Sequence, residues 1–491
     1  ENIIYDASTS EKAKREFIQQ ISPTSGMIQA GQRIIDQGEI VDAHTYNILS
    51  SLKRVIEERS GGVGSDSWRL VGEFMLVLIL MGSFYFYLLY FRPREFRNRK
   101  NVTFMLLIIT FFVILTAITV KYNLFNVYII PYAIVTILIR TFIDSRTALF
   151  ASIVTILLSS LMVPYPFEFI VIQITVAMVS IFVLKELTER SQLIQSSFFI
   201  LMTYILVYLG LTLYAEGDIK KVNGMVLVYF LINFIFIMFS YLLVYIFEKS
   251  FGFISGVSMV ELANINKPLL KELSEKAPGT FQHSMQVSNL ATAAASRIGA
   301  NASLVRTGAL YHDIGKMVNP AFFTENQASG INPHAGLPFE ESARIIINHV
   351  KDGVKIAKQN GLPQQIIDFI ETHHGTSVPK YFYIQWKNVN PGKEIDEEVF
   401  RYPGPNPFSK ETAIVMMADA VEASSRSLTE YSEESFRDLV NKIIDDQVGE
   451  GYFKKAPITF KDIETVKEVF VDKLKTIYHT RIAYPELKGG V

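Results

Sequence analysis

The 491-residue sequence contains no cysteine and only two tryptophans. The absence of cysteine excludes disulfides and thiolate metal sites, so any transition metal must be held by histidine and carboxylate side chains. Net charge is also nearly absent, at −1, which does not favour the basic face that a binder of DNA or RNA duplexes needs. Because the chain begins at Glu1 with neither Met nor a signal-like apolar stretch, we expect a fragment or processed form of a longer protein.

Apolar residues are abundant, at 49% of the chain, and indicate a membrane protein. After a polar, mixed segment over 1–68 come seven apolar stretches, each close to the roughly 20 residues with which a helix crosses the hydrocarbon core. They lie near 69–91, 103–120, 124–142, 147–163, 167–184, 195–214 and 224–247. Their charges cluster at the ends of the spans, which favours an anchoring or signal-receiving role over transport.

Loop charge predicts the orientation of these spans. The loop RPREFRNRK (92–100) carries five Lys or Arg residues, and the positive-inside rule places it in the cytoplasm. An odd number of spans then leaves residues 1–68 outside and everything beyond Phe251 in the cytoplasm. The loop AEGDIKKVN (215–223) argues weakly against this orientation with its two lysines.

Six of the eight histidines fall between 283 and 374, and most lie on segments with a helical pattern. Asp313 follows one of them in ALYHDIGKM (309–317), where we expect Gly315 to end the helix. Asp419 lies in the apolar run AIVMMADAV (413–421), and a buried carboxylate is costly unless it is paired or bound to metal. In an all-α bundle one group of side chains can converge: His283, His312, Asp313, His349, His373, His374 and Asp419.

Five imidazoles and two carboxylates are too many for one four-coordinate zinc site. They suit two divalent ions such as iron or manganese, with Asp313 as the bridging carboxylate. Such a pair activates water and stabilises the attacking and leaving oxygens of a phosphoryl ester. Lys316 is a catalytic candidate that would neutralise phosphate charge, although an interaction with the helix dipole explains it equally well.

His283, His312-Asp313 and Asp419 form an H…HD…D pattern that resembles the HD phosphohydrolase superfamily, and the remaining histidines resemble its two-metal members. Further motifs make the chain similar to the bacterial seven-transmembrane receptors with an HD domain. These motifs are APGTFQHS (277–284), YHDIGK (311–316), ENQASGINPH (325–334), HHGT (373–376), FRYPGPNP (400–407) and MADAVEASSRSL (417–428). The resemblance is strongest over 253–485, while residues 1–68 match only the end of that family's outer domain.

The resemblance implies an all-α protein of the bacterial cell membrane. A short extracytoplasmic helical segment (1–68) would precede seven transmembrane helices (69–250), a connector (251–280) and a cytoplasmic HD phosphohydrolase bundle (281–491). It also implies how the ligands divide. One metal would be held by His283, His312, Asp313 and Asp419, and the other by Asp313, His349, His373 and His374.

The implied activity is hydrolysis of cyclic di-AMP to linear pApA. The HD-GYP enzymes, which cleave cyclic di-GMP, share an HDIGK-like motif, but here HHGTSVPKYFY (373–383) replaces their Gly-Tyr-Pro signature. Hydrolysis of another nucleotide, such as cyclic di-GMP or a dNTP, and nucleotide binding without catalysis are the alternatives. The expected partners are cyclic di-AMP and the lipid bilayer, with a homo-oligomer and an unidentified extracytoplasmic signal left open. Candidate substrate contacts, for which loop capping is an equal alternative, are Asn326, Asn332, His334 and Arg426, together with Lys316.

Overall fold

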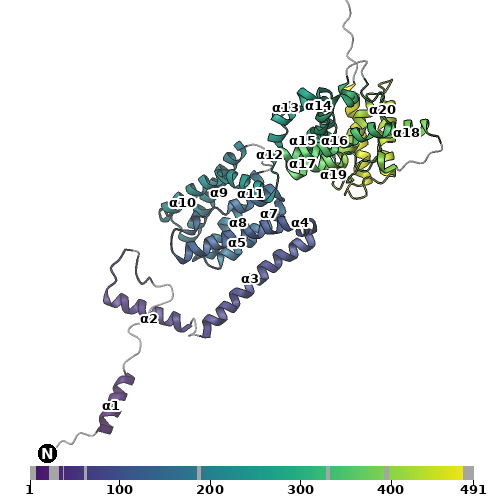
Figure 1. Cartoon of the computed structure of the whole chain (residues 1–491). Coiled ribbons are helices and arrows are strands. Elements are labelled where there is room, and N and C mark those ends of the chain that lie inside the picture. The colour runs from purple at the N-terminus through teal and green to yellow at the C-terminus, as the bar shows by residue number, and fades with distance from the viewer. Residues whose placement is uncertain are drawn as a thin grey trace, which may run out of the picture. The chain divides into compact units, whose positions relative to one another are not determined.

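The computed structural model of the chain describes residues 7–20, 33–36, 38–59, 64–184, 190–327, 332–391 and 397–478. Every regular element in these ranges is a helix, which confirms the all-α prediction. The chain divides into two compact units, residues 1–79 and 80–491. The first unit contains α1 (Ala7–Gln20), α2 (Ala43–Arg59) and the beginning of α3 (Gly64–Phe91). The second contains all the later helices (Figure 1).

All seven predicted apolar stretches contain a helix. Four described helices are long and apolar enough to cross a membrane: α3, α5 (Arg99–Lys121), α8 (Pro166–Val183) and α9 (Arg190–Glu216). A fifth span results if α10 (Gly224–Met238) and α11 (Ser240–Phe251), which are bent by 40°, are counted together. The third and fourth stretches are shorter than predicted, because Pro131 separates α6 (Ala133–Phe142) from a 3-10 turn and α7 ends at Ser160.

The buried polar side chains in the helices from α3 to α11 are neutral and mostly hydrogen-bonded. Asn233 Nδ2 donates to the carbonyl of Tyr128 at 2.8 Å, and the Tyr204 hydroxyl donates to Gln173 Oε1 at 2.9 Å. An ion pair occurs at the helix ends instead, where Arg92 lies 3.2 Å from Asp144. This arrangement agrees with an anchoring role, because charges at mid-membrane depth are the usual mark of a transport path.

The chain after α11 forms a second group of helices. A short α12 (Gly256–Leu262) and α13 (Pro268–Lys276) lead into α14 (Pro278–Arg297) and α15 (Ala302–Tyr311). Next come α16 (Phe339–Gln359), α17 (Gln364–Thr372), α18 (Lys380–Val389), α19 (Lys410–Ser425), α20 (Glu433–Gly449) and α21 (Phe460–Ile477). Apolar faces of α14, α15, α19, α20 and α21 share one buried core, with Leu290, Val415 and Phe470 fully inside it. This core fixes α14, α15 and α19, which carry or precede four of the predicted metal ligands.

The helix before His312 ends earlier than the sequence suggested, and Gly315 has another role. Helix α15 ends at Tyr311, and a 3-10 turn, η3 (Ile314–Val318), follows Asp313. A Cβ atom on Gly315 would lie 1.8 Å from the carbonyl oxygen of His349. Glycine is therefore needed for close packing of η3 against α16, and this packing brings Asp313 next to His349.

Candidate metal centre

The seven predicted ligands come from five separate helices or their ends. His283 lies on α14, His349 on α16 and Asp419 on α19. His312 and Asp313 follow α15, and His373 and His374 follow α17. All except His374 are buried, and the side chain of His374 is 24% exposed. The fold thus brings together side chains that are up to 136 positions apart in the sequence.

Two overlapping groups of these side chains have the arrangement of metal ligands. In each group, the candidate ligand atoms lie within 4.8 Å of one another. The first group is His283, His312, Asp313 and Asp419, and the second is Asp313, His349, His373 and His374. Asp313 belongs to both, as the sequence predicted for a bridging carboxylate.

The two oxygens of Asp313 face different groups. Oδ2 lies 3.2 Å from Nε2 of His312 and 3.6 Å from Nε2 of His283. Oδ1 lies 3.3 Å from Nε2 of His349 and 3.5 Å from Nε2 of His373. A carboxylate with one oxygen directed at each set of imidazoles has the geometry of a bridge between two ions.

The imidazoles are oriented by hydrogen bonds at their other nitrogen. Nδ1 of His312, His349 and His373 each lies against the carbonyl three residues earlier, at 2.7, 2.5 and 2.9 Å. Nδ1 of His283 contacts Oε2 of Glu422. If Nδ1 carries the proton in each ring, Nε2 is free to bind a metal, and such outer contacts are typical of metal-ligating histidines.

Two buried atoms at this point, Oδ1 of Asp313 and Nε2 of His312, have no hydrogen-bond partner among the described residues, while Oδ2 of Asp313 has an ion-pair contact with Lys316 at 2.7 Å. Leaving buried polar atoms unsatisfied costs about 1–3 kcal/mol each. The Nε2 atoms of His349 and His373 also lie only 3.1 Å apart. Divalent cations between these atoms would satisfy them, so the donor set fits two metal ions.

Electrostatics favour the ligand forms of several of these groups. Burial raises the pKa of Asp313, but Lys316 and His312 lower it by more, so the carboxyl pKa lies well below its ordinary value. Burial and the neighbouring His373 hold the pKa of His374 well below the ordinary value, which keeps that imidazole neutral. For His312, burial lowers the pKa, but Asp313 and Asp419 raise it by more, to about 10. A metal and a proton would therefore compete for His312.

Lys316 is directed at the carboxylates rather than at solvent. Its Nζ lies 2.7 Å from Asp313 Oδ2 and 2.9 Å from Glu325 Oε1, and its side chain is 12% exposed. Glu325 also accepts a hydrogen bond from Thr280 on α14. Lys316 is thus fixed beside the bridging carboxylate, a position that the helix-dipole alternative does not explain.

The four predicted substrate contacts make hydrogen bonds to other residues of the chain in this structure. Asn326 accepts from the Thr280 amide and donates to its hydroxyl, and Asn332 accepts from the amide of His334. Nε2 of His334 contacts the carbonyl of Phe322, and Arg426 donates to Glu422. Only the contact of Asn332 with the amide of His334 is that of a loop cap, and the substrate role of the four residues stays a prediction.

Two residues at the site were missed in the sequence. Glu422 lies three positions after Asp419, on the same side of α19, and this spacing is the signal that could have revealed it. The ring of Tyr402, in the motif FRYPGPNP, packs at 4.3 Å between centroids from that of His374. No spacing connects Tyr402 to the histidines, because it reaches them from a distant, irregular segment.

Comparisons with known proteins show the family of this chain. Family models described as "7TM receptor with intracellular HD hydrolase", "HD domain" and "7TM-HD extracellular" match residues 67–255, 280–424 and 1–55. The cyclic-di-AMP phosphodiesterase PgpH of Listeria monocytogenes is 34% identical over 504 residues, which cover 99% of this chain and 68% of the relative. The chain belongs to this family of seven-transmembrane HD receptors. It is accordingly a membrane protein.

Two further members of the family are similar to this chain. The cyclic-di-AMP phosphodiesterase PgpH of Bacillus subtilis is 32% identical over 502 residues, covering 99% of this chain and 68% of the relative. A crystal structure of the L. monocytogenes PgpH HD domain in complex with cyclic-di-AMP is 47% identical. It covers 44% of this chain and 100% of its own, with a TM-score of 0.42.

Proposed function

We propose that this protein is a membrane-anchored, two-metal phosphodiesterase that hydrolyses cyclic di-AMP to linear pApA. The observation that carries the proposal is the position of Asp313, whose two oxygens face separate sets of imidazoles. A site with two overlapping ligand groups suits hydrolysis of a phosphate ester. The substrate is inferred from the two relatives named as cyclic-di-AMP phosphodiesterases, which align with 99% of the chain.

The proposed ligands divide as the resemblance implied. His283, His312 and Asp419 would hold one ion, His349, His373 and His374 the other, and Asp313 both. Imidazole and carboxylate donors suit iron or manganese. When bound, the two ions would supply an activated water and stabilise negative charge on the phosphoryl oxygens.

The other residues of the site hold these groups in place. Lys316 keeps the Asp313 carboxylate ionised and supplies a positive charge next to the phosphate that would occupy the site. Glu325 fixes the ammonium of Lys316, and Thr280 in turn fixes Glu325. The partial exposure of His374 and the ring of Tyr402 beside it mark the side from which a nucleotide would enter.

The proposed organisation follows the charge of the loops. Residues 1–68 would lie outside, 69–250 would form the seven-span domain, 251–280 the connector and 281–491 the cytoplasmic HD domain. Five basic residues in 92–100 support this orientation. A cytoplasmic catalytic domain would meet a nucleotide messenger where such messengers are made.

The test is a turnover assay with the full chain in lipid nanodiscs, loaded with manganese or, under anaerobic conditions, with ferrous iron. Cyclic di-AMP, cyclic di-GMP and a dNTP are offered separately, and products are separated by liquid chromatography. We expect pApA from cyclic di-AMP and little product from the other two. Turnover of cyclic di-GMP or the dNTP alone would overturn the substrate, and binding without product from any of them would favour a nucleotide receptor.

The variant Asp313→Asn should lose activity in the same assay. It removes the bridging charge with almost no change of shape, so we expect no pApA above background. Asp438→Asn is the control, because Asp438 is an exposed acid on α20, away from the site. If both variants retain full turnover, the site is misassigned.

A further inference from the structure

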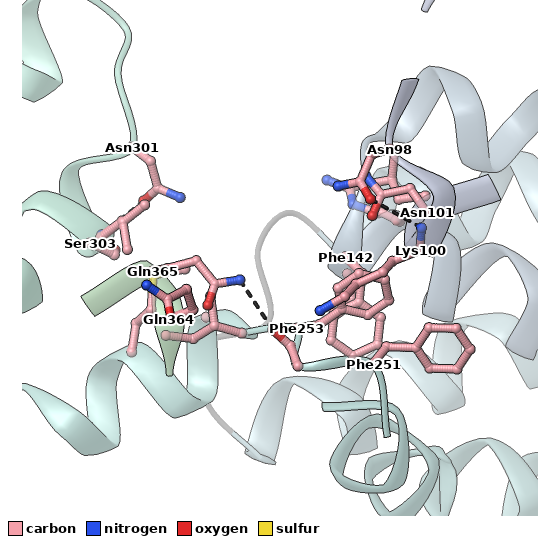
Figure 2. A pocket seen from close by; sticks show the side chains of 18 of the residues that line it. Asn98, Lys100, Asn101, Phe142, Phe251, Phe253, Asn301, Ser303, Gln364 and Gln365 are labelled. Carbon is pink, nitrogen blue, oxygen red and sulfur yellow. Dashed lines mark hydrogen bonds between the residues drawn. The ribbon is translucent and has the colours of Figure 1, made fainter. Parts of the chain in front are cut away.

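A cavity separate from the metal centre lies where the ends of the membrane helices meet the connector and the HD domain (Figure 2). We call it the junction cavity. Its volume is about 740 Å³, within the range of about 300–1,000 Å³ typical of small-molecule sites. Its lining comes from helix ends at 98–101, 140–143 and Leu184, from residues 251–259, and from the beginnings of α15 and α17.

The charged residues that line the junction cavity in the described ranges are mainly basic. Among the described residues, Arg99, Lys100 and Arg140 line it, together with the carboxylate of Asp368, which accepts a hydrogen bond from Gln364 at 2.9 Å. Arg140 also donates to the carbonyl of Ile181. Lys100 is exposed, and its ammonium makes no ion pair within the described ranges. Nζ of Lys100 comes within 3.7 Å of the place that a Cβ atom on Gly252 would take, so it reaches over the beginning of the connector. An anion would balance the charge of the Lys100 ammonium.

One buried acceptor in the junction cavity lacks a donor. Gln365 on α17 uses its Nε2 to donate to the carbonyl of Gly252 at 3.2 Å. Its Oε1 is buried and has no partner in the part of the chain that the structure describes. A buried carbonyl oxygen in this situation calls for a hydroxyl or amine donor from a ligand or a water molecule.

The wall of the junction cavity that lies across from Gln365 is aromatic. The ring centroids of Phe142 and Phe253 lie 5.0 Å apart, and those of Phe251 and Phe253 lie 5.5 Å apart. Figure 2 shows Lys100 on the side of Phe142 and Phe251, across from Gln365. The cavity therefore combines cations, a hydroxyl-seeking acceptor and an apolar wall.

We propose that the junction cavity binds a phosphate anion bearing a hydroxyl group, and that the headgroup of an anionic glycerophospholipid supplies it. The cavity lies at the ends of α5, α6, α8 and α11, on the side of the basic loop 92–100. In the proposed orientation this side would lie at the level of the cytoplasmic lipid phosphates. Basic pockets between membrane helices on the cytoplasmic side are known to take such headgroups. A soluble phosphate ester of glycerol has the same chemistry and is the alternative source.

The occupant would touch both the membrane helices and the catalytic domain. Gln365 lies on α17, the helix that ends just before His373 and His374. The connector that lines the cavity is bonded to α15 through Thr307, whose hydroxyl donates to the carbonyl of Met259 at 3.1 Å. Bound lipid would thus fix the position of the connector between the bilayer and two ligand-bearing helices.

The test measures chemical acylation of Lys100 in the full chain, by mass spectrometry, in three preparations. These are nanodiscs of phosphatidylcholine, nanodiscs containing phosphatidylglycerol, and phosphatidylcholine nanodiscs with soluble sn-glycerol 1-phosphate. Lys249 is the internal control, because it lies in the last turn of α11 and does not line the cavity. With phosphatidylglycerol we expect labelling of Lys100, normalised to Lys249, to fall about fivefold, the size expected of one contact near the membrane surface.

The other outcomes are equally decisive. Protection by soluble glycerol phosphate but not by phosphatidylglycerol would overturn the lipid as the source. Equal labelling of Lys100 in all three preparations would overturn the site itself. Gln365→Glu, which places a carboxylate beside the anion, should abolish the protection, whereas Gln359→Glu on the exposed end of α16 should not. Neither measurement depends on turnover, so failure of the proposed enzyme activity would leave the result intact.

Discussion

Nδ1 of His283 and Oε2 of Glu422 are in direct hydrogen-bond contact between α14 and α19. The other oxygen of Glu422 accepts two hydrogen bonds from Arg426, at 3.0 and 2.6 Å. Glu422 is buried, and both of its oxygens are used. Its position fixes the ring of His283 so that Nε2 points at Asp419, 2.9 Å away.

Glu422→Gln should weaken metal binding without unfolding the protein. A glutamine has one acceptor oxygen where the carboxylate has two, so either His283 or Arg426 loses its partner. We expect the affinity of the His283 group for manganese to fall about 10–100-fold, as for other outer-shell changes. Chelator competition titration measures this, with the exposed Glu434→Gln on α20 as control. Unchanged affinity would show that Glu422 has no such role.

The number of metal ions that a variant binds should depend on whether the substituted ligand belongs to one group or to both. His283→Ala and His349→Ala each remove a ligand of one group only, and each variant should retain one ion. Asp313→Asn should lose both, because its two oxygens serve both groups. Elemental analysis of the purified full chain measures the content. Retention of two ions in Asp313→Asn would rule out a bridging role.

Lys316→Ala should reduce turnover while metal content stays near that of the wild type. The ammonium is 2.7 Å from Asp313 but is not itself a ligand, so its loss removes charge stabilisation rather than the ions. We expect kcat to fall about 100-fold, the effect of removing one preorganised electrostatic partner. Lys358→Ala, at the exposed end of α16, is the control. Full activity in Lys316→Ala would favour the alternative that Lys316 only interacts with the helix dipole.

Most of the fold could be predicted from the sequence because it depends on local patterns, whereas the division of the proposed ligands into two groups came from the resemblance to a family. Apolar run length located the membrane stretches, and histidines on apolar helical faces indicated convergence. The length of the apolar run overestimated the helix in the third stretch, because Pro131 lies between the 3-10 turn and α6. Gly315 was misread for a similar reason: its requirement comes from a backbone oxygen of His349, which is remote in the sequence.

Contacts that depend on tertiary structure were beyond the sequence. Glu325 and Thr280 meet across 45 positions, and Tyr402 reaches His374 from an irregular segment. The junction cavity is likewise formed by helix ends, the connector and two helices of the catalytic domain, none of which carries a motif for it. Such sites become visible only when separate segments are placed together.

Tyr311→Phe should loosen the contact between the connector and α15. The hydroxyl of this buried tyrosine donates to the carbonyl of Leu262 at 2.9 Å, and Phe preserves the ring. Loss of the hydrogen bond costs about 1 kcal/mol, so hydrogen exchange of the amides of 257–262 should accelerate severalfold. Exposed Tyr381→Phe should leave exchange there unchanged. Unaltered exchange in Tyr311→Phe would show that other contacts hold the connector.

The ion pair between Lys410 and Asp462 should make stability depend on pH at the acid end. Lys410 begins α19, the helix of Asp419, and its Nζ lies 2.8 Å from Oδ2 of Asp462 on α21. Burial raises the pKa of Asp462, but hydrogen bonds from Lys410 and Thr459 lower it by more, to below the ordinary value of 3.8. Because the pKa is lower in the folded state, this stabilisation is present above about pH 4 and is lost as the pH falls further.

The Asp462→Asn variant tests this direction of the pH dependence of stability. At pH 7 the variant should be less stable than the wild type by up to about 1 kcal/mol, the range for a partly exposed pair. The difference should shrink below pH 4, where Asp462 of the wild type becomes protonated. Thermal unfolding of the full chain between pH 3 and pH 7 measures it, with exposed Asp438→Asn as control. A difference that grows towards low pH would mean that the pKa of Asp462 is raised, contrary to the contact with Lys410.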